Sequence, residues 1–229
     1  MATVVIDPGH GGSSEIGGSS PNNAKGPGGL LEKDLTLDLA LRVRAALATS
    51  AVDVRLTRDA DRNLGLRARA DIARQAQADA FVSIHFNGFN GEAQGTETWH
   101  HRAASGDSKA LATLVQAAVR KATGLKERGV KLGGFAVLRP DFHAESTAAC
   151  LVEVSFMDVA AEEARLRTEA YKDKLAAALA GAIEGWLIAD GRMAASALLA
   201  TLRAGPGPQS EDGFEVAHLE GELAGESIA

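Results

Sequence analysis

Two histidines and two glutamates stand at positions where this chain could build a metal-dependent hydrolytic site. His10 and His85 each follow a short apolar run, and Glu153 comes directly after another. Glu32 lies in the first turn of a predicted helix. Each residue alone has an ordinary explanation, such as a loop histidine, an acid favoured by the helix dipole or an ion-paired carboxylate. The chemistry depends on whether the fold brings the four residues together.

Two imidazoles and one carboxylate form a ligand set for catalytic zinc, and they leave the fourth tetrahedral position to water. Zinc lowers the pKa of that water to about 7 and polarises a carbonyl group. A second carboxylate could then take the water proton and pass it to a leaving amine. Glu153 fits that second role, although the wide spacing in the sequence leaves a capping or ion-paired carboxylate open.

The elements around these residues explain how they could meet. The apolar runs 4–6, 80–84 and 148–152 predict buried strands, and Gly and Pro residues end the first at Asp7-Pro8-Gly9. Because the carboxyl ends of parallel strands meet at one edge of a sheet, we expect the residues that follow these strands to converge. A helix from about Leu30 carries an apolar residue every four positions, at Leu31, Leu35, Leu39, Val43 and Leu47.

The rest of the chain continues the alternation of strands and helices. We expect further strands at 53–57, 95–101 and 135–138, and helices at 64–77, 108–123 and 169–189. The sequence also predicts a further helix at about 192–203. Arg67 and Arg69 are interpreted as solvated charges on a helix, with Arg67 able to brace a loop. The adjacent His100 and His101 are interpreted as surface residues.

Charge divides the chain into a neutral body and an acidic end. The formal net charge is −6, from 24 basic and 30 acidic residues. Six of the acids and none of the bases lie in residues 205–229, so the body carries 24 of each. We therefore expect a domain at 1–190, followed at 191–229 by a helix and an acidic, disordered tail. Nothing in the neutral body resembles the basic patch of a nucleic-acid-binding protein.

The sequence also gives expectations about membrane spans, export and disulfide bonds. No apolar stretch is long enough to span a membrane, and the start of the chain runs straight into the first strand without the pattern of a signal peptide. Cys150 is the only cysteine, so no disulfide can form within the chain, and its apolar surroundings predict a buried thiol.

Five stretches of the chain stand out together, and they span roughly residues 3–188. The stretches are VVIDPGHGG (4–12), GLLEKDLTLDLA (29–40), VRLTRDADRNLGLRARADIA (54–73), ADAFVSIHFN (78–87) and ACLVEVSFM (149–157). In sequence and in order they resemble the zinc-dependent N-acetylmuramoyl-L-alanine amidases of the Amidase_3 family.

The resemblance implies a single α/β domain, with a mostly parallel sheet flanked by helices on both faces. It assigns one zinc ion per chain to His10, Glu32 and His85, and it makes Glu153 the catalytic glutamate. The implied reaction is hydrolysis of the amide between N-acetylmuramic acid and the L-alanine of the peptidoglycan stem peptide. Phe86 after the second histidine, and the residues after Glu153, depart from the family pattern and affect substrate contacts rather than the reaction class.

Two other functions stay open at this point. Another zinc peptidase acting on the stem peptide would use the same metal chemistry, and a non-catalytic wall-binding module would share the fold. Retention of all four polar residues argues against the second. We expect the protein to act on the cell wall, in the periplasm or outside the cell. We also expect it to be a monomer without a nucleic-acid partner. Both a host remodelling enzyme and a phage lysin are compatible with the sequence.

Overall fold

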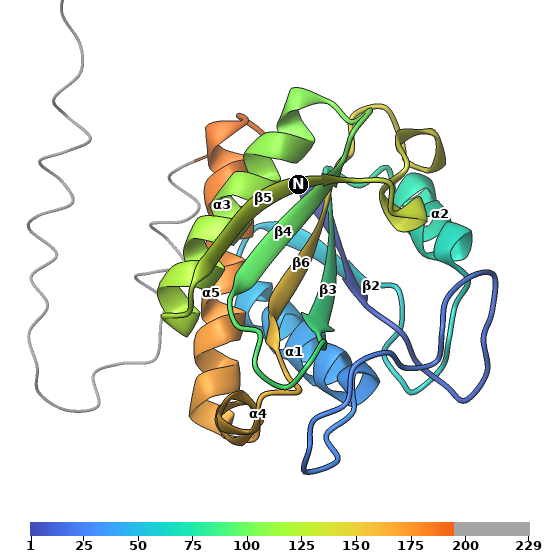
Figure 1. The fold of residues 1–229 in the computed structure, drawn as a ribbon. Helices are drawn as coiled ribbons and strands as arrows, with labels where there is room; N and C mark the ends of the chain where they lie inside the picture. The colour runs from blue at the N-terminus through green and yellow to red at the C-terminus, as the bar shows by residue number, and fades with distance from the viewer. Residues whose placement is uncertain (195–229) are drawn as a thin grey trace, which may run out of the picture.

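The computed structural model describes residues 1–194. Within them the chain forms six strands, five α-helices and two 3-10 helices (Figure 1). The strands are β1 (Ala2–Pro8), β2 (Val52–Leu56), β3 (Ala80–Asn87), β4 (Thr96–His101), β5 (Glu127–Gly133) and β6 (Ala148–Phe156). The helices are α1 (Glu32–Leu47), α2 (Leu66–Gln75), α3 (Gly106–Thr123), η1 (Ala136–Leu138), η2 (Pro140–Phe142), α4 (Ala160–Leu166) and α5 (Glu169–Ala189).

The strands form one sheet in the order β2-β1-β3-β6-β4-β5. All neighbouring strands of this described sheet run parallel except β4 and β6, which are antiparallel. The three apolar runs of the sequence became the central strands β1, β3 and β6, whose inner residues are buried on both faces. Strands of this kind occur where helices cover both sides of a sheet. The predicted single α/β domain with a mostly parallel sheet is therefore confirmed.

Helices cover both faces of the sheet, as predicted. Figure 1 shows α1, α3 and α5 grouped on one side of the sheet and α2 on the other. The larger core lies under the first group, where Leu35, Leu39 and Val43 of α1 are fully or almost fully buried. Cys150 is also buried in this core, as its apolar surroundings predicted. The smaller core lies under α2 and η1, and it includes Phe81 and Leu151.

Two local predictions were wrong, and one strand was missed. The apolar run 135–138 forms no strand, because Val137 and Leu138 cover the smaller core from the 3-10 turn η1. The edge strand is β5 instead, which has too few apolar residues to show a strand pattern in the sequence. His100 is only 7% exposed, so the surface interpretation holds only for its half-buried neighbour His101.

The end of the chain falls mostly outside the described residues. Residues 192 and 193, the first two of the predicted helix at 192–203, form a bend, and residues 195–203 lie outside the described residues. The predicted acidic tail also lies outside the described residues. Within residues 1–194, every helix is too short or too polar to cross a lipid bilayer.

Candidate metal centre

The three predicted metal ligands meet at the carboxyl edge of the sheet. His10 lies in the loop after β1, His85 lies in β3, and Glu32 is the first residue of α1. One potential ligand atom from each residue lies within 4.8 Å of the other two. Glu32 Oε1 is 3.2 Å from His10 Nε2 and 3.1 Å from His85 Nδ1. The fold therefore brings together residues as far apart in the sequence as His10 and His85, which are separated by 75 positions.

Glu32 is held in place by the backbone as well as by the two imidazoles. The backbone N–H of Ala24 donates to Oε2 at 2.8 Å, and that of Phe86 donates to Oε1 at 3.1 Å. Burial raises the pKa of this carboxyl group, but hydrogen bonds and charge from His10 and His85 outweigh burial and lower the pKa to about 2. Glu32 is thus a fixed, ionised carboxylate beside the two imidazoles.

The His10 ring is oriented by its other nitrogen. Nδ1 lies 3.0 Å from the carbonyl oxygen of Ser20 and 3.1 Å from its Oγ, and a protonated Nδ1 would donate to that carbonyl, because a carbonyl only accepts. In the neutral ring Nε2 then presents its lone pair toward Glu32, and this kind of partner commonly fixes a metal-binding histidine. The backbone of His10 has a φ of 62°, a left-handed conformation that non-glycine residues seldom adopt and that often marks functional sites.

The donor set and its spacing fit zinc. Two imidazole nitrogens and one carboxylate oxygen match a common catalytic zinc set, which keeps its fourth position open. Ligand atoms that share a tetrahedral zinc ion at about 2.0–2.2 Å lie about 3.4 Å apart. The two distances from Glu32 Oε1, 3.2 and 3.1 Å, are close to that separation. The two imidazole nitrogens lie within 4.8 Å of each other, so the three side chains could share one ion once the rings close on it.

Glu153 lies beside this centre on the neighbouring strand. It is the direct register partner of His85, within β6 rather than after its end as the sequence suggested. Its Oε2 atom is buried and has no hydrogen-bond partner among the described residues. Burial, together with the nearby charges of Glu32 and Glu97, raises the pKa of Glu153 well above its usual range. The carboxyl group is thus free of structural partners and has a high affinity for a proton.

A buried arginine that the sequence did not reveal braces the His10 loop. Arg69 is 1% exposed and donates to Asp7 Oδ1 at 2.9 Å, to the Pro8 carbonyl at 2.7 Å and to the His10 carbonyl at 2.8 Å. The interpretation of Arg69 as a solvated charge was therefore wrong. The brace is also not Arg67, whose exposed side chain lies over the ring of Phe142.

A second buried arginine completes this support. Arg58 donates to the carbonyls of Pro8 and Gly9 at 3.0 and 2.9 Å, and Thr36 Oγ1 also donates to Gly9 at 2.8 Å. Burial, with a smaller effect from the charge of Arg69, lowers the pKa of Arg58 to about 10. The backbone carbonyls of residues 8–10 are therefore all fixed by cationic donors, which places the imidazole of His10.

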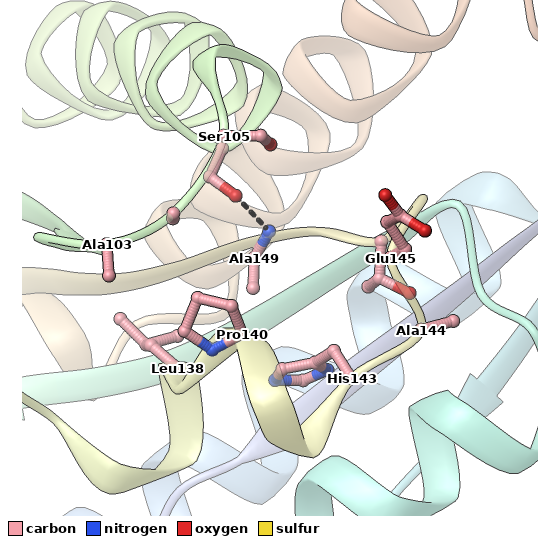
Figure 2. A pocket seen from close by; sticks show the side chains of 11 residues that line it. Ala103, Ser105, Leu138, Pro140, His143, Ala144, Glu145 and Ala149 are labelled. Atoms are coloured by element: carbon pink, nitrogen blue, oxygen red, sulfur yellow. Dashed lines mark hydrogen bonds between the residues drawn. The ribbon is translucent and has the colours of Figure 1, made fainter.

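Several hollows of the described residues are larger than the one at the predicted ligands. One of about 660 Å³ lies between α3 and α5. Another, of about 470 Å³, lies toward the opposite edge of the sheet and is lined by Ser105, His143 and Ala149 among others (Figure 2). Ala149 precedes Glu153 by four residues on β6, or by about 13 Å. His143 is already committed, because its Nε2 lies 2.8 Å from the Val137 carbonyl. A smaller hollow of about 100 Å³ includes His10 and His85, so chemistry rather than size locates the candidate site.

Comparisons with known proteins identify the family of the chain. The Amidase_3 family profile, described as N-acetylmuramoyl-L-alanine amidase, matches residues 4–185. The chain is 35% identical over 179 residues to the N-acetylmuramoyl-L-alanine amidase LytC of Bacillus subtilis, an alignment that covers 77% of this chain and 34% of LytC. The chain spans about a third of the length of the first two curated relatives, LytC and a cell wall amidase of Bacillus anthracis.

Solved structures give the same result. The catalytic domain of CwlV, an N-acetylmuramoyl-L-alanine amidase from Bacillus (Paenibacillus) polymyxa, superposes with a TM-score of 0.69 at 36% identity, covering 82% of this chain and 98% of that domain. The amidase AmiC2 of Nostoc punctiforme gives a TM-score of 0.71 at 36% identity, covering 81% of this chain and 97% of that one. The protein described here belongs to the Amidase_3 family.

Proposed function

We propose that this protein hydrolyses the amide between N-acetylmuramic acid and the L-alanine of the peptidoglycan stem peptide. The observation that carries the proposal is the convergence of His10, Glu32 and His85 beside the unpartnered carboxyl group of Glu153. The names of the relatives and of the solved structures support the same reaction. Its substrate would be the cell wall, outside the cytoplasm.

The metal in this proposal is one zinc ion per chain, held by His10, Glu32 and His85. When bound, zinc would supply a Lewis acid for the carbonyl of the scissile amide. The protein contributes the orientation of the ligands. Ser20 fixes the His10 ring, and the backbone of Ala24 and Phe86 fixes Glu32. Residues 1–190 would form the catalytic domain, with the chain from 191 onward outside the site.

Glu153 is proposed to move the proton. A general base accepts a proton from the attacking water and returns it to the departing nitrogen, so its carboxyl group must be free of structural hydrogen bonds. Its buried Oε2, which has no hydrogen-bond partner among the described residues, meets this condition. The alternative role, a fourth metal ligand, would fill the position that hydrolysis requires to stay open.

Analysis of the products tests the reaction. Digestion of purified peptidoglycan should release intact stem peptides that begin with a free L-alanine amino group. Treatment with a chelator should abolish release, and zinc should restore it. His10→Ala should lose zinc and activity together, because two protein ligands hold zinc poorly. Shortened peptides without free L-alanine would instead indicate a peptidase that cuts within the stem.

A further inference from the structure

The face of the sheet that carries Glu153 continues onto the edge strands β4 and β5. Glu97 on β4 is the direct register partner of Glu153, and Gly129 on β5 is the partner of Glu97. The side chains of Glu97, Trp99 and Lys131 share this face, since Lys131 contacts both of the others. A row of residues therefore leads from the metal centre across Glu153 to the edge of the sheet.

Glu97 organises two cations at the end of this row. Its side chain is 8% exposed, and one oxygen, Oε2, accepts from Arg128 Nε at 2.6 Å and from Lys131 Nζ at 2.5 Å. Asn87 Nδ2 donates to the other oxygen at 3.3 Å. One buried carboxylate thus fixes two cationic side chains, and this cluster, formed by Glu97, Arg128 and Lys131, carries a net positive charge beside Glu153.

The guanidinium of Arg128 is fixed but not saturated. Its Nε binds Glu97, and its planar group lies over the ring of Phe156, 4.9 Å from the centroid. Its two terminal amino groups have no hydrogen-bond partner within the part of the chain that the structure describes, and the side chain is 34% exposed. The free edge of a guanidinium matches the two oxygens of a carboxylate. Arg128 therefore presents a ready anion receptor.

We propose that Arg128, oriented by Glu97 and assisted by Lys131, binds a carboxylate of the stem peptide just beyond the scissile amide. This assignment rests on the proposed amidase function. Neighbouring strands lie about 4.8 Å apart, so the cluster on β4 and β5 lies roughly 5–10 Å from the strand of Glu153. Two extended peptide residues reach about 7 Å, at about 3.5 Å each, which lies within that range. The second stem residue, a glutamate joined through its side-chain carboxyl, offers a free α-carboxylate in that range.

Two muramyl peptides that differ in one group test the proposal. One carries a free α-carboxylate on the second stem residue, and the other carries a carboxamide there, with all other carboxylates shared. We expect the wild-type zinc enzyme to cleave the carboxylate form with a kcat/KM about tenfold higher, equivalent to about 1.4 kcal/mol. In Arg128→Gln this preference should fall to within about twofold of unity, while Arg128→Lys should recover part of it.

Arg55→Gln provides the matched control. Arg55 is another half-exposed arginine paired with a carboxylate, Asp53, but it lies on β2 at the opposite edge of the sheet. This variant should keep the wild-type preference. If Arg128→Gln unfolds, Lys131→Gln takes its place and should also lower the preference, by a smaller factor.

Three outcomes would overturn the proposal. The first is a wild-type enzyme that cleaves both peptides equally well. The second is an Arg128→Gln variant with lower activity but an unchanged preference, which would mean a purely structural role. The third is a wild-type enzyme that cleaves neither peptide and releases nothing from peptidoglycan, which would remove the amidase function and this subsite with it.

Discussion

Gly9 lies against the ring of His85, a proposed metal ligand, and Gly9→Ala should separate metal binding from folding. A Cβ atom on Gly9 would lie 2.3 Å from Cε1, 2.5 Å from Nε2 and 2.7 Å from Nδ1 of the His85 ring. Carbon atoms in contact prefer separations of about 3.5–4.0 Å. One of the two groups must therefore move by about 1 Å or more.

The ring should move rather than the backbone. The N–H of Gly9 donates to the Ile84 carbonyl at 3.0 Å, and its carbonyl accepts from Thr36 and Arg58 at 2.8 and 2.9 Å. Because metal–ligand distances tolerate only about 0.2 Å, the displaced imidazole would cease to be a ligand. Substitution of residues that only hydrogen-bond to metal ligands already lowers metal affinity about 10–100-fold. We therefore expect zinc affinity to fall at least about a hundredfold.

The stability of the metal-free protein should change much less. Overpacking of this kind costs about 1–3 kcal/mol, which urea unfolding in the presence of a chelator would measure. Zinc affinity would be measured by competition with a chromophoric chelator. Gly181→Ala is the control, because a Cβ at that position on α5 meets no atom within 4 Å. A Gly9→Ala protein that binds zinc within threefold of wild type would refute the reasoning.

Three further predictions concern the body of the protein and its end. Arg69→Met should cost about 3–5 kcal/mol in urea unfolding, because it leaves Asp7 buried without its partner; a loss below 1 kcal/mol would contradict this. Burial raises the pKa of Asp7, but the charge of Arg69 and the hydrogen bonds of its neighbours lower that pKa overall. The stabilisation of the folded state by ionised Asp7 should therefore be complete above about pH 3.9, the pKa of an unfolded Asp. It should be lost as the pH falls through the lower pKa of Asp7 in the folded protein. Burial raises the pKa of the Cys150 thiol, so iodoacetamide at pH 8 should label it only after unfolding, and rapid labelling of the folded protein would oppose this. A chain that ends after Arg203 should keep its activity on wall fragments and a Tm within about 2 °C, whereas a larger drop would show that the acidic end packs on the domain.

The sequence alone predicted the strands and helices whose apolar residues follow a regular local spacing. The apolar runs before His10, His85 and Glu153 predicted central strands, and the shared edge of parallel strands then predicted that the residues would meet. The four-residue spacing of leucines likewise placed Glu32 at the start of a helix. These signals are short-range, and they are strong because buried strands and amphipathic helices have fixed periods.

The features that the sequence did not reveal depend on contacts between distant segments. Arg69 binds Asp7 across 62 positions, and nothing in the residues around Arg69 distinguishes it from the exposed Arg67. Glu97 is buried only because Arg128 and Lys131 come from a strand at the edge of the sheet, whose sequence has no regular apolar pattern. Long-range ion pairs of this kind follow from the fold and not from local periodicity.

The most direct test of the account compares zinc content and turnover in wild type and Glu153→Gln. The glutamine keeps the shape of the side chain but cannot carry a proton. We expect one zinc per chain in both proteins, and a release of stem peptide that is at least about a hundredfold slower in the variant. Turnover close to wild type would remove Glu153 from the mechanism. Loss of zinc together with activity would contradict the account by making Glu153 a metal ligand.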